Sequence, residues 1–363
     1  MRFCLSLIFI LLLSLSLSFQ AAARSRVEMV FVLDTTGSMS GLIEGAKKKI
    51  WAIANAVVDQ NPQAEIYMGL VGYRDLGDDY VTRHFPLTTD IQSIYARLLT
   101  FEAKGGGDTP ESVNEALDVA LGRMGWSDGK ESADRILFLV GDAPPHMDYE
   151  QDRKYTEIIR EAAARSIIVN TVLCGNLRET ARVWKEMAHL GKGEYMAIPQ
   201  DGGTVVVVVT PYDDSITIIQ KKLNRTILPY GAAALKRVVE EKARQYEEAP
   251  APRAADISSY VNKSTAGKGV ITGEGDLVAD IKEGRARLDK IKEEELPEAL
   301  RALPPAQREA HVRGLDEERA RLSEELAAQV RLRDEYISGQ SSAAPDSFDA
   351  NVVKTLKKQI KAE

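Results

Sequence analysis

Cysteine and histidine are scarce in this chain. Its 363 residues include two cysteines and four histidines, and Cys4 lies at the very start, ahead of an apolar segment. Once that segment is removed, Cys174 is the one cysteine left, and it cannot form an internal disulfide. No H-E-x-x-H motif occurs, which argues against a zinc hydrolase of that class. The fold must therefore rely on its hydrophobic core, to which a metal ion could add.

Long apolar runs are missing after residue 23, and later stretches fall short of the roughly 18 apolar residues that a membrane helix needs. We therefore expect no membrane span. Residues 1–23 contain one charge, Arg2, then an apolar segment and the small residues Ala21, Ala22 and Ala23. This arrangement is typical of a secretory signal peptide cleaved before Arg24. The sequence predicts an exported protein, periplasmic or secreted, and export without disulfides is compatible with a bacterial envelope.

Basic residues are fewer than acidic ones, 47 against 54. The formal net charge is −7 and the sequence pI is about 5.4, so the basic face that nucleic acid requires is not expected. Hydrophobic residues make up 44% and charged residues 28% of the chain, as in soluble globular proteins. The length suggests about two domains. Composition gives no indication of an oligomeric state.

Apolar strand-like runs alternate with helical patterns between residues 27 and 228. Residues 27–33 are apolar apart from Glu28, and 135–140 are apolar after Arg135. Such nearly continuous runs are typical of strands buried on both faces of a parallel sheet. Strands are expected at 27–33, 64–73, 80–85, 135–140, 167–173 and 193–198, with a further edge strand at 205–209. Helices are expected at 43–57, 90–101, 110–124, 150–165, 178–190 and 213–223. This alternation predicts a doubly wound, mostly parallel α/β domain with helices on both faces of the sheet.

The composition changes after residue 228. Residues 229–276 are interpreted as a linker, because 246–256 is rich in proline and alanine and 267–276 in glycine. Residues 277–363 are expected to form a charged helical region. Apolar residues recur there at helical spacing, but Arg319, Gln329 and Arg333 interrupt the pattern, which argues against a long coiled coil. A helical hairpin broken by Pro297 and by the pair 304–305 is expected instead.

Oxygen-bearing side chains gather where the buried strands end. Asp34 directly follows the first strand, and Thr36 and Ser38 come after it at two-residue steps. Asp142 takes the equivalent place after 135–140, and Thr109 lies just before a helix in the segment GGGDTPES. In open α/β sheets, ligand-binding sites lie at the carboxyl ends of the strands. Carboxylates and hydroxyls without sulfur or imidazole suit a hard cation, so we expect Mg²⁺, Mn²⁺ or Ca²⁺.

These segments resemble a von Willebrand factor A domain with a metal-ion-dependent adhesion site, whose signature is D-x-S/T-x-S followed by a threonine and an aspartate. The resemblance covers residues 27–228 and is strongest to exported bacterial members carrying DTTGSM, GGGD-x-PE and DAPPH segments. It implies a strand order of 3-2-1-4-5-6 with one antiparallel edge strand. Asp34, Thr36 and Ser38 match the first motif, Thr109 the second and Asp142 the third, which often acts through water. The resemblance further implies that an Asp or Glu of a protein partner completes the metal shell.

Three further residues lie close to this pattern. Asp108 precedes the expected threonine, and either of the two could point inward. Asp75 ends the second strand and could reach the same rim, although a surface turn is the more common role. His146 follows the DAPP segment and could ligate a metal, although a loop histidine is more often structural. Glu111 is expected to compensate the dipole of the following helix.

The sequence thus predicts a non-enzymatic, metal-dependent binding or adhesion module outside the cytoplasm. Two alternatives stay open. One is a magnesium-dependent phosphohydrolase with Asp34 as nucleophile, although DTT lacks the second aspartate of a D-x-D motif. The other is a periplasmic scaffold that acts through the helical tail, with the metal only stabilising a loop.

Overall fold

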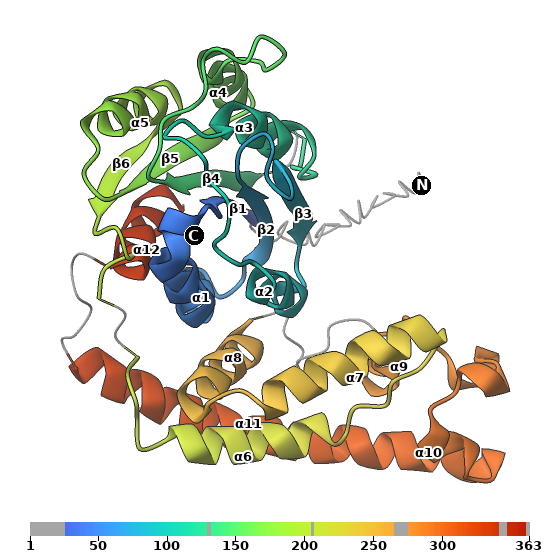
Figure 1. Cartoon of the computed structure of the whole chain (residues 1–363). Helices are drawn as coiled ribbons and strands as arrows, with labels where there is room; N and C mark the ends of the chain where they lie inside the picture. Colours follow the sequence, from blue (N-terminus) through green and yellow to red (C-terminus); the bar gives the residue numbers. More distant parts are fainter. Residues whose placement is uncertain (1–25, 129–131, 205–206, 265–274, 341–346, 361–363) are drawn as a thin grey trace, which may run out of the picture.

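The computed structural model describes residues 26–128, 132–204, 207–264, 275–340 and 347–360 (Figure 1). The predicted signal peptide, residues 1–23, lies outside the described residues. An α/β domain and a layer of helices beside it make up the described part of the chain (Figure 1).

The central sheet follows the expected order, β3-β2-β1-β4-β5-β6. β3 pairs antiparallel with β2 at one edge, and the other neighbouring pairs are parallel. The fold-class prediction is therefore confirmed. The strands are β1 (Arg26–Asp34), β2 (Glu65–Tyr73), β3 (Thr82–Thr88), β4 (Ala133–Gly141), β5 (Ile167–Cys174) and β6 (Lys192–Ile198).

β1 is central because both of its faces are apolar. Alternate side chains of a strand point to opposite faces. Met29, Phe31 and Leu33 enter one core, whereas Val30 and Val32 enter the other. The first core is covered by α1 (Ser40–Gln60), which a short 3₁₀ turn (Gly37–Met39) precedes, by α2 (Ile91–Leu99) and by α12 (Phe348–Gln359). The second is covered by α3 (Val113–Gly122), α4 (Tyr155–Ala164) and α5 (Arg178–Leu190).

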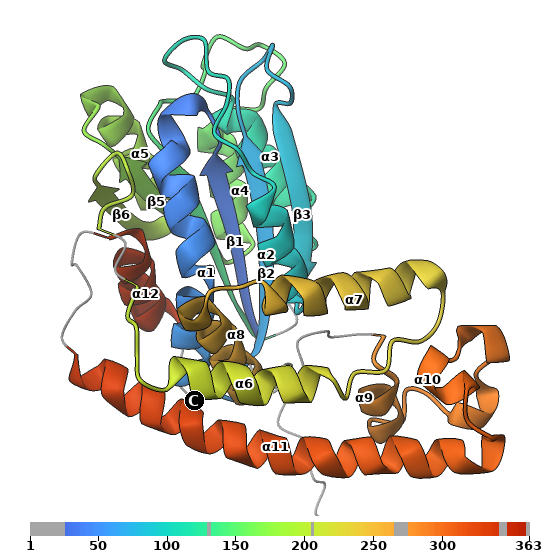
Figure 2. The ribbon, with the colours of Figure 1, turned by 60° about the horizontal axis from the view of Figure 1, so that its bottom comes forward.

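The remaining helices lie against the end of this domain opposite the β1–α1 loop (Figure 2). They are α6 (Asp213–Asn224), α7 (Ala233–Glu247), α8 (Ala251–Lys263), α9 (Leu277–Lys282), α10 (Glu298–Arg301) and α11 (Pro305–Gly339), with 3₁₀ turns at Leu288–Lys290 and Glu293–Glu295. α11 runs alongside α6 and also contacts α8 and α9 (Figure 2). Within the described ranges, none of the helices combines the length and the apolar character that crossing a membrane requires.

Several local expectations need correction. The segment 229–276, interpreted as a linker, contains α7 and α8, and its glycine-rich residues 265–274 lie outside the described part. Pro250 is the N-cap residue of α8, and Pro252 lies in the first turn, where proline is tolerated, so these prolines mark the start of a helix. Tyr246 and Ile257 then join the core beside α1. Residues 207–209 form no strand, and 205–206 lie outside the described residues. The positions of the domain boundaries, at 228 and 276, stay a prediction.

The C-terminal region is also arranged differently from the expected hairpin. α11 is one helix of 35 residues, and its partners are α6, α8 and α9. α12 leaves this layer and packs on the sheet, where the rings of Phe348 and Phe31 lie 6.4 Å apart. The last helix of the predicted charged region therefore covers the α/β core.

Two arginines that interrupt the apolar pattern of α11 are buried contacts of its inner face. Arg319 Nη1 lies 2.6 Å from Asp276 Oδ2, and its Nε donates to Thr226 Oγ1 at 2.6 Å. Arg333 pairs in the same way with Asp213 and Asp256, at 2.8 and 2.7 Å. A partner acid distant in the sequence thus allows arginine where an apolar residue would otherwise pack.

Arg319→Ala should lower the free energy of unfolding by about 3–5 kcal/mol, because Asp276 would stay buried without its counter-charge. Arg321, an exposed residue of the same helix, provides the matched control. Arg321→Ala should change stability by about 0.5 kcal/mol or less. Urea denaturation of both variants measures this. Equal, small losses would show that the Arg319 pair contributes nothing.

Candidate metal centre

Asp34 is the last residue of β1 and its side chain has no solvent exposure, 0%. Its Oδ1 accepts hydrogen bonds from the Thr36 backbone nitrogen at 2.8 Å and from Thr36 Oγ1 at 2.6 Å. Its Oδ2 is buried and has no hydrogen-bond partner among the described residues. A buried polar atom without a partner is costly and calls for an explanation.

The pKa of Asp34 is raised from 3.8 to about 7. Desolvation by burial is the main cause. The Asp142 carboxyl adds to it by repulsion and as a hydrogen-bond partner of the protonated form, while the hydrogen bonds from Thr36 act in the opposite direction. Among the residues that the structure describes, no cation compensates this buried carboxylate. Either a proton or a cation can relieve this cost.

Asp142 follows β4 and lies beside Asp34. Gly141 makes this approach feasible, since a Cβ there would lie 3.3 Å from Asp34 Oδ2 and 2.3 Å from the Tyr73 hydroxyl. Gln200, after β6, donates to Asp142 Oδ2 at 2.6 Å. Thr180 Oγ1 donates to the backbone oxygen of Asp142 at 3.0 Å. Asp142 is therefore fixed from two sides, and sequence reasoning did not identify Gln200.

Two hydroxyls of the first loop lie close to Asp34 or to each other. Thr36 Oγ1 is hydrogen-bonded to Asp34 and is 3.3 Å from Ser38 Oγ. The Gly37 nitrogen donates to the Gly105 oxygen at 3.2 Å, which brings the glycine-rich loop against the first loop. Thr109 lies further along that second loop with an exposed side chain. Among the described residues, no hydrogen bond joins Thr109 to Asp34, Thr36 or Asp142, so its role as a ligand stays a prediction.

Glu111 differs from its expected role. α3 begins at Val113, so Glu111 lies ahead of the helix and outside its first turn. Its backbone nitrogen donates to Pro144 at 2.9 Å, and its backbone oxygen accepts from the His146 nitrogen at 3.0 Å. Its side chain is buried, Oε2 has no hydrogen-bond partner among the described residues, and its pKa is raised to about 9 by burial and then by Asp34 and Asp75. Glu111 is thus a further buried carboxyl of this centre.

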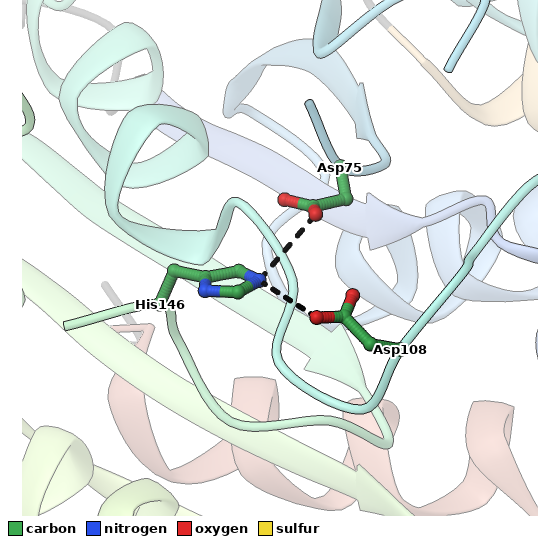
Figure 3. A group of neighbouring side chains, drawn as sticks. All are labelled: Asp75, Asp108 and His146. Carbon is green, nitrogen blue, oxygen red and sulfur yellow. Dashed lines mark ion pairs between the residues drawn. The ribbon is translucent and has the colours of Figure 1, made fainter. Parts of the chain in front are cut away.

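Asp75, Asp108 and His146 form a second group beside the first (Figure 3). Asp75 follows β2, Asp108 belongs to the glycine-rich loop and His146 follows β4. Asp75 and His146 are buried, whereas Asp108 is exposed. The structure therefore brings together all three of the residues that the sequence placed near the rim.

The donors around Asp34 fit a hard divalent cation. Carboxylate oxygens of Asp34 and Asp142 and hydroxyls of Thr36 and Ser38 lie at the carboxyl ends of β1 and β4. Such oxygens are the ligands that Mg²⁺, Mn²⁺ and Ca²⁺ take in proteins. The buried Oδ2 of Asp34, which no described group satisfies, is the atom that such an ion would satisfy.

A doubly wound sheet with an acidic, hydroxyl-rich cluster at the end of its central strand defines an α/β domain with a candidate cation site. The family model of the von Willebrand factor A domain matches residues 28–211, more than half of the 363 residues. The chain belongs to this family, whose domains are typically protein-interaction modules.

Several known proteins are similar over parts of the chain. von Willebrand factor A domain-containing protein 7 of Mus musculus is 38% identical over 25% of this chain and 10% of its own length. A putative ariadne-like RING finger protein of Acanthamoeba polyphaga mimivirus is 22% identical over 51% of this chain and 19% of its own. Alpha-protein kinase vwkA of Dictyostelium discoideum is 27% identical over 33% of this chain and 19% of its own length. The chain thus spans 19% or less of the length of each relative.

Among solved structures, the chain is similar to the crystal structure of the SpRpn10 VWA domain. The match has a TM-score of 0.37 and 14% identity, and it covers 48% of this chain and 88% of that one.

The ion-free protein should become more stable as the pH falls from about 7 to about 4. The folded pKa of Asp34 lies above its unfolded value, so the folded state binds the proton more tightly over this window. The slope should reach about 1.4 kcal/mol per pH unit for one proton. Glu111, whose pKa is raised too, acts in the same direction.

Asp34→Asn provides the comparison, because it removes the titrating carboxyl and keeps its shape. In EDTA this variant should be more stable than the wild type at pH 8 and should show a shallower pH slope. Urea denaturation across this range measures both. An identical slope in the two proteins would show that Asp34 is ionised normally.

Proposed function

We propose that this chain is an extracytoplasmic, metal-dependent protein-binding module of the von Willebrand factor A family. In this proposal the ion is Mg²⁺, with Mn²⁺ or Ca²⁺ as alternatives, and an Asp or Glu of the partner protein completes its shell. The location outside the cytoplasm depends on the sequence of residues 1–23. The proposed ligands are Asp34, Thr36, Ser38, Thr109 and Asp142.

The observation that carries the proposal is the buried Oδ2 of Asp34, which lacks a hydrogen-bond partner among the described residues. A bound cation would supply the missing counter-charge, and Thr36 already orients the other oxygen toward the loop. Gln200 holds Asp142 Oδ2 at 2.6 Å, which favours contact between Asp142 and the ion through water.

The mixture of ligands suits a site that binds a partner. Two carboxylates balance the charge of a divalent ion without exceeding it, and the neutral hydroxyls leave the ion able to accept an incoming carboxylate as a further ligand. Ser38 and Thr109 are exposed, so the proposed ion would be accessible from outside through them. A site with four carboxylates would satisfy the ion fully and leave it a structural role.

The phosphohydrolase alternative is less well supported. A nucleophilic aspartate must touch the phosphorus atom, whereas Asp34 is 0% exposed and one of its oxygens already accepts two hydrogen bonds. Aryl phosphate turnover with magnesium that disappears in Asp34→Asn would support that alternative and contradict the binding module.

Magnesium should raise the melting temperature of the wild-type protein, because a ligand that binds only the folded state stabilises it. The gain should be about 2.7 kcal/mol at a hundredfold excess over Kd. Asp34→Asn should abolish the gain while raising stability in EDTA, an opposite pair of effects that general damage does not produce. Asp214→Asn, at an exposed carboxylate of α6, should behave as the wild type. A wild-type melting temperature that changes with neither EDTA nor magnesium would contradict the metal site.

Partner binding should depend steeply on divalent cation and only weakly on sodium chloride. The chain is acidic, so long-range attraction for an acidic partner is poor, and a short ion bridge must provide the affinity. A pull-down from envelope extracts with magnesium or EDTA would identify the partner, and salt and magnesium titrations would measure its affinity. Thr109→Ala should weaken binding without loss of fold. A partner released by moderate salt yet retained in EDTA would place the binding surface elsewhere, with the charged helical tail as the next surface to test.

A further inference from the structure

Asp75, Asp108 and His146 aim one donor atom each at a common point beside the Asp34 centre. The three atoms all lie within 4.8 Å of one another (Figure 3). His146 Nε2 is 3.4 Å from Asp75 Oδ2 and 3.8 Å from Asp108 Oδ2. Neither distance is that of an N–H···O hydrogen bond.

The ring of His146 is held so that Nε2 faces the two carboxylates. Nδ1 lies 2.9 Å from Asp148 Oδ1, and because an ionised carboxylate only accepts, we assign the proton of this bond to Nδ1. The ring also stacks on Tyr149 at 4.0 Å. His146 is 7% exposed, and its Nε2 has no hydrogen-bond partner among the described residues. In the neutral ring this atom carries a lone pair directed at two anionic oxygens.

Asp75 is held equally firmly. Ser112 Oγ donates to its Oδ1 at 2.8 Å, and the Tyr149 hydroxyl donates to its Oδ2 at 2.9 Å. Two buried side chains with fixed orientations therefore present acceptor atoms to each other across 3.4 Å. Acceptors so close repel unless a proton or a cation lies between them.

We propose that Asp75, Asp108 and His146 form a second cation site, for a transition-metal ion such as Zn²⁺, distinct from the Asp34 centre. One imidazole nitrogen with two carboxylate oxygens is a donor set that zinc takes. Zinc–ligand bonds of about 2.0–2.2 Å in a tetrahedron separate the donors by about 3.3–3.6 Å. The Asp75–His146 distance of 3.4 Å lies in this range. Asp108 lies 3.8 Å from His146 and within 4.8 Å of Asp75, so its exposed side chain would have to move closer to complete the set.

The surroundings match those of histidine-based metal sites. A ligating histidine normally donates its other ring N–H to a carboxylate or carbonyl, and the ligating carboxylates are hydrogen-bonded in turn. Asp148 fills the first role, while Ser112 and Tyr149 fill the second. The ion would tie Asp108, and with it the exposed glycine-rich loop, to the two buried ligands. This inference goes beyond the proposed partner binding and does not depend on it.

The competing explanation is a protonated His146, whose positive charge would balance the surrounding acids. Zinc binding by the full-length protein distinguishes the two. Equilibrium dialysis against Zn²⁺ at saturating Mg²⁺ counts the ions, and long-range ¹H–¹⁵N spectra of the four histidine rings locate them. The wild type should bind one Zn²⁺ per chain and shift the Nε2 resonance of His146, while the rings of His84, His189 and His311 stay unchanged.

Asp108→Asn is the decisive variant, because its exposed side chain can change without disturbing the fold. It should weaken zinc binding at least tenfold, and His146→Gln should abolish it. Glu150→Gln, at an exposed carboxylate of the same loop as His146, should bind as the wild type. Asp34→Asn should retain the zinc, which separates this site from the proposed magnesium site. Equal zinc affinity in Asp108→Asn and wild type, or a His146 ring that ignores zinc, would overturn the proposal.

Discussion

Asp34 ends the central strand with its carboxylate away from solvent and with one oxygen that no described donor reaches. Removing a carboxylate from water costs several kcal/mol unless a counter-charge compensates. Asp34 is buried because of where it lies in the sheet. It ends β1, which is flanked by β2 and β4 and contributes apolar side chains to both cores. At the middle of its sheet the domain thus buries a negative charge that no cation among the described residues balances. Asp142 and Glu111 add to this uncompensated negative charge, because Asp142 raises the pKa of Asp34, and burial, followed by repulsion from Asp34, raises the pKa of Glu111.

Apolar runs were enough to predict the six strands, whereas their order came from the family resemblance, and the further edge strand expected at 205–209 does not form at 207–209. Val27 to Leu33 had to be a strand buried on both faces, and Asp34 had to lie at its end. The helical layer could not be derived in this way, because periodicity counts apolar residues and cannot detect a partner acid. Arg319 interrupts the pattern of α11 in the sequence, yet in the structure it bonds to Asp276 and Thr226 inside the interface. Pro250 likewise suggested a linker, whereas it precedes the first turn of a helix.

The position of a site residue relative to the strands decides whether it could be predicted from the sequence. Asp34, Thr36, Ser38 and Asp142 follow strands directly, so strand order alone gathers them. Glu111 precedes a helix, where dipole compensation is a sufficient explanation from sequence. Its burial results from bonds to the segment that contains Pro144 and His146, which only the folded chain brings alongside. Gln200 reaches Asp142 from beyond β6, and no local pattern marks a glutamine in such a loop.

The glycine-rich loop connects the two groups of acids. Gly105 accepts a hydrogen bond from Gly37 of the first loop, and Asp108, three residues later, faces His146. Thr109, the predicted ligand of the magnesium site, is the next residue along the chain. A zinc ion that orders Asp108 would therefore restrict the positions open to Thr109. A magnesium ion that orders Thr109 would likewise restrict Asp108. Since linkage between two binding equilibria is reciprocal, any gain in magnesium affinity that zinc produces must appear as the same gain in zinc affinity with magnesium bound. The geometry thus makes the loop, rather than the rigid sheet, the element through which one centre would influence the other.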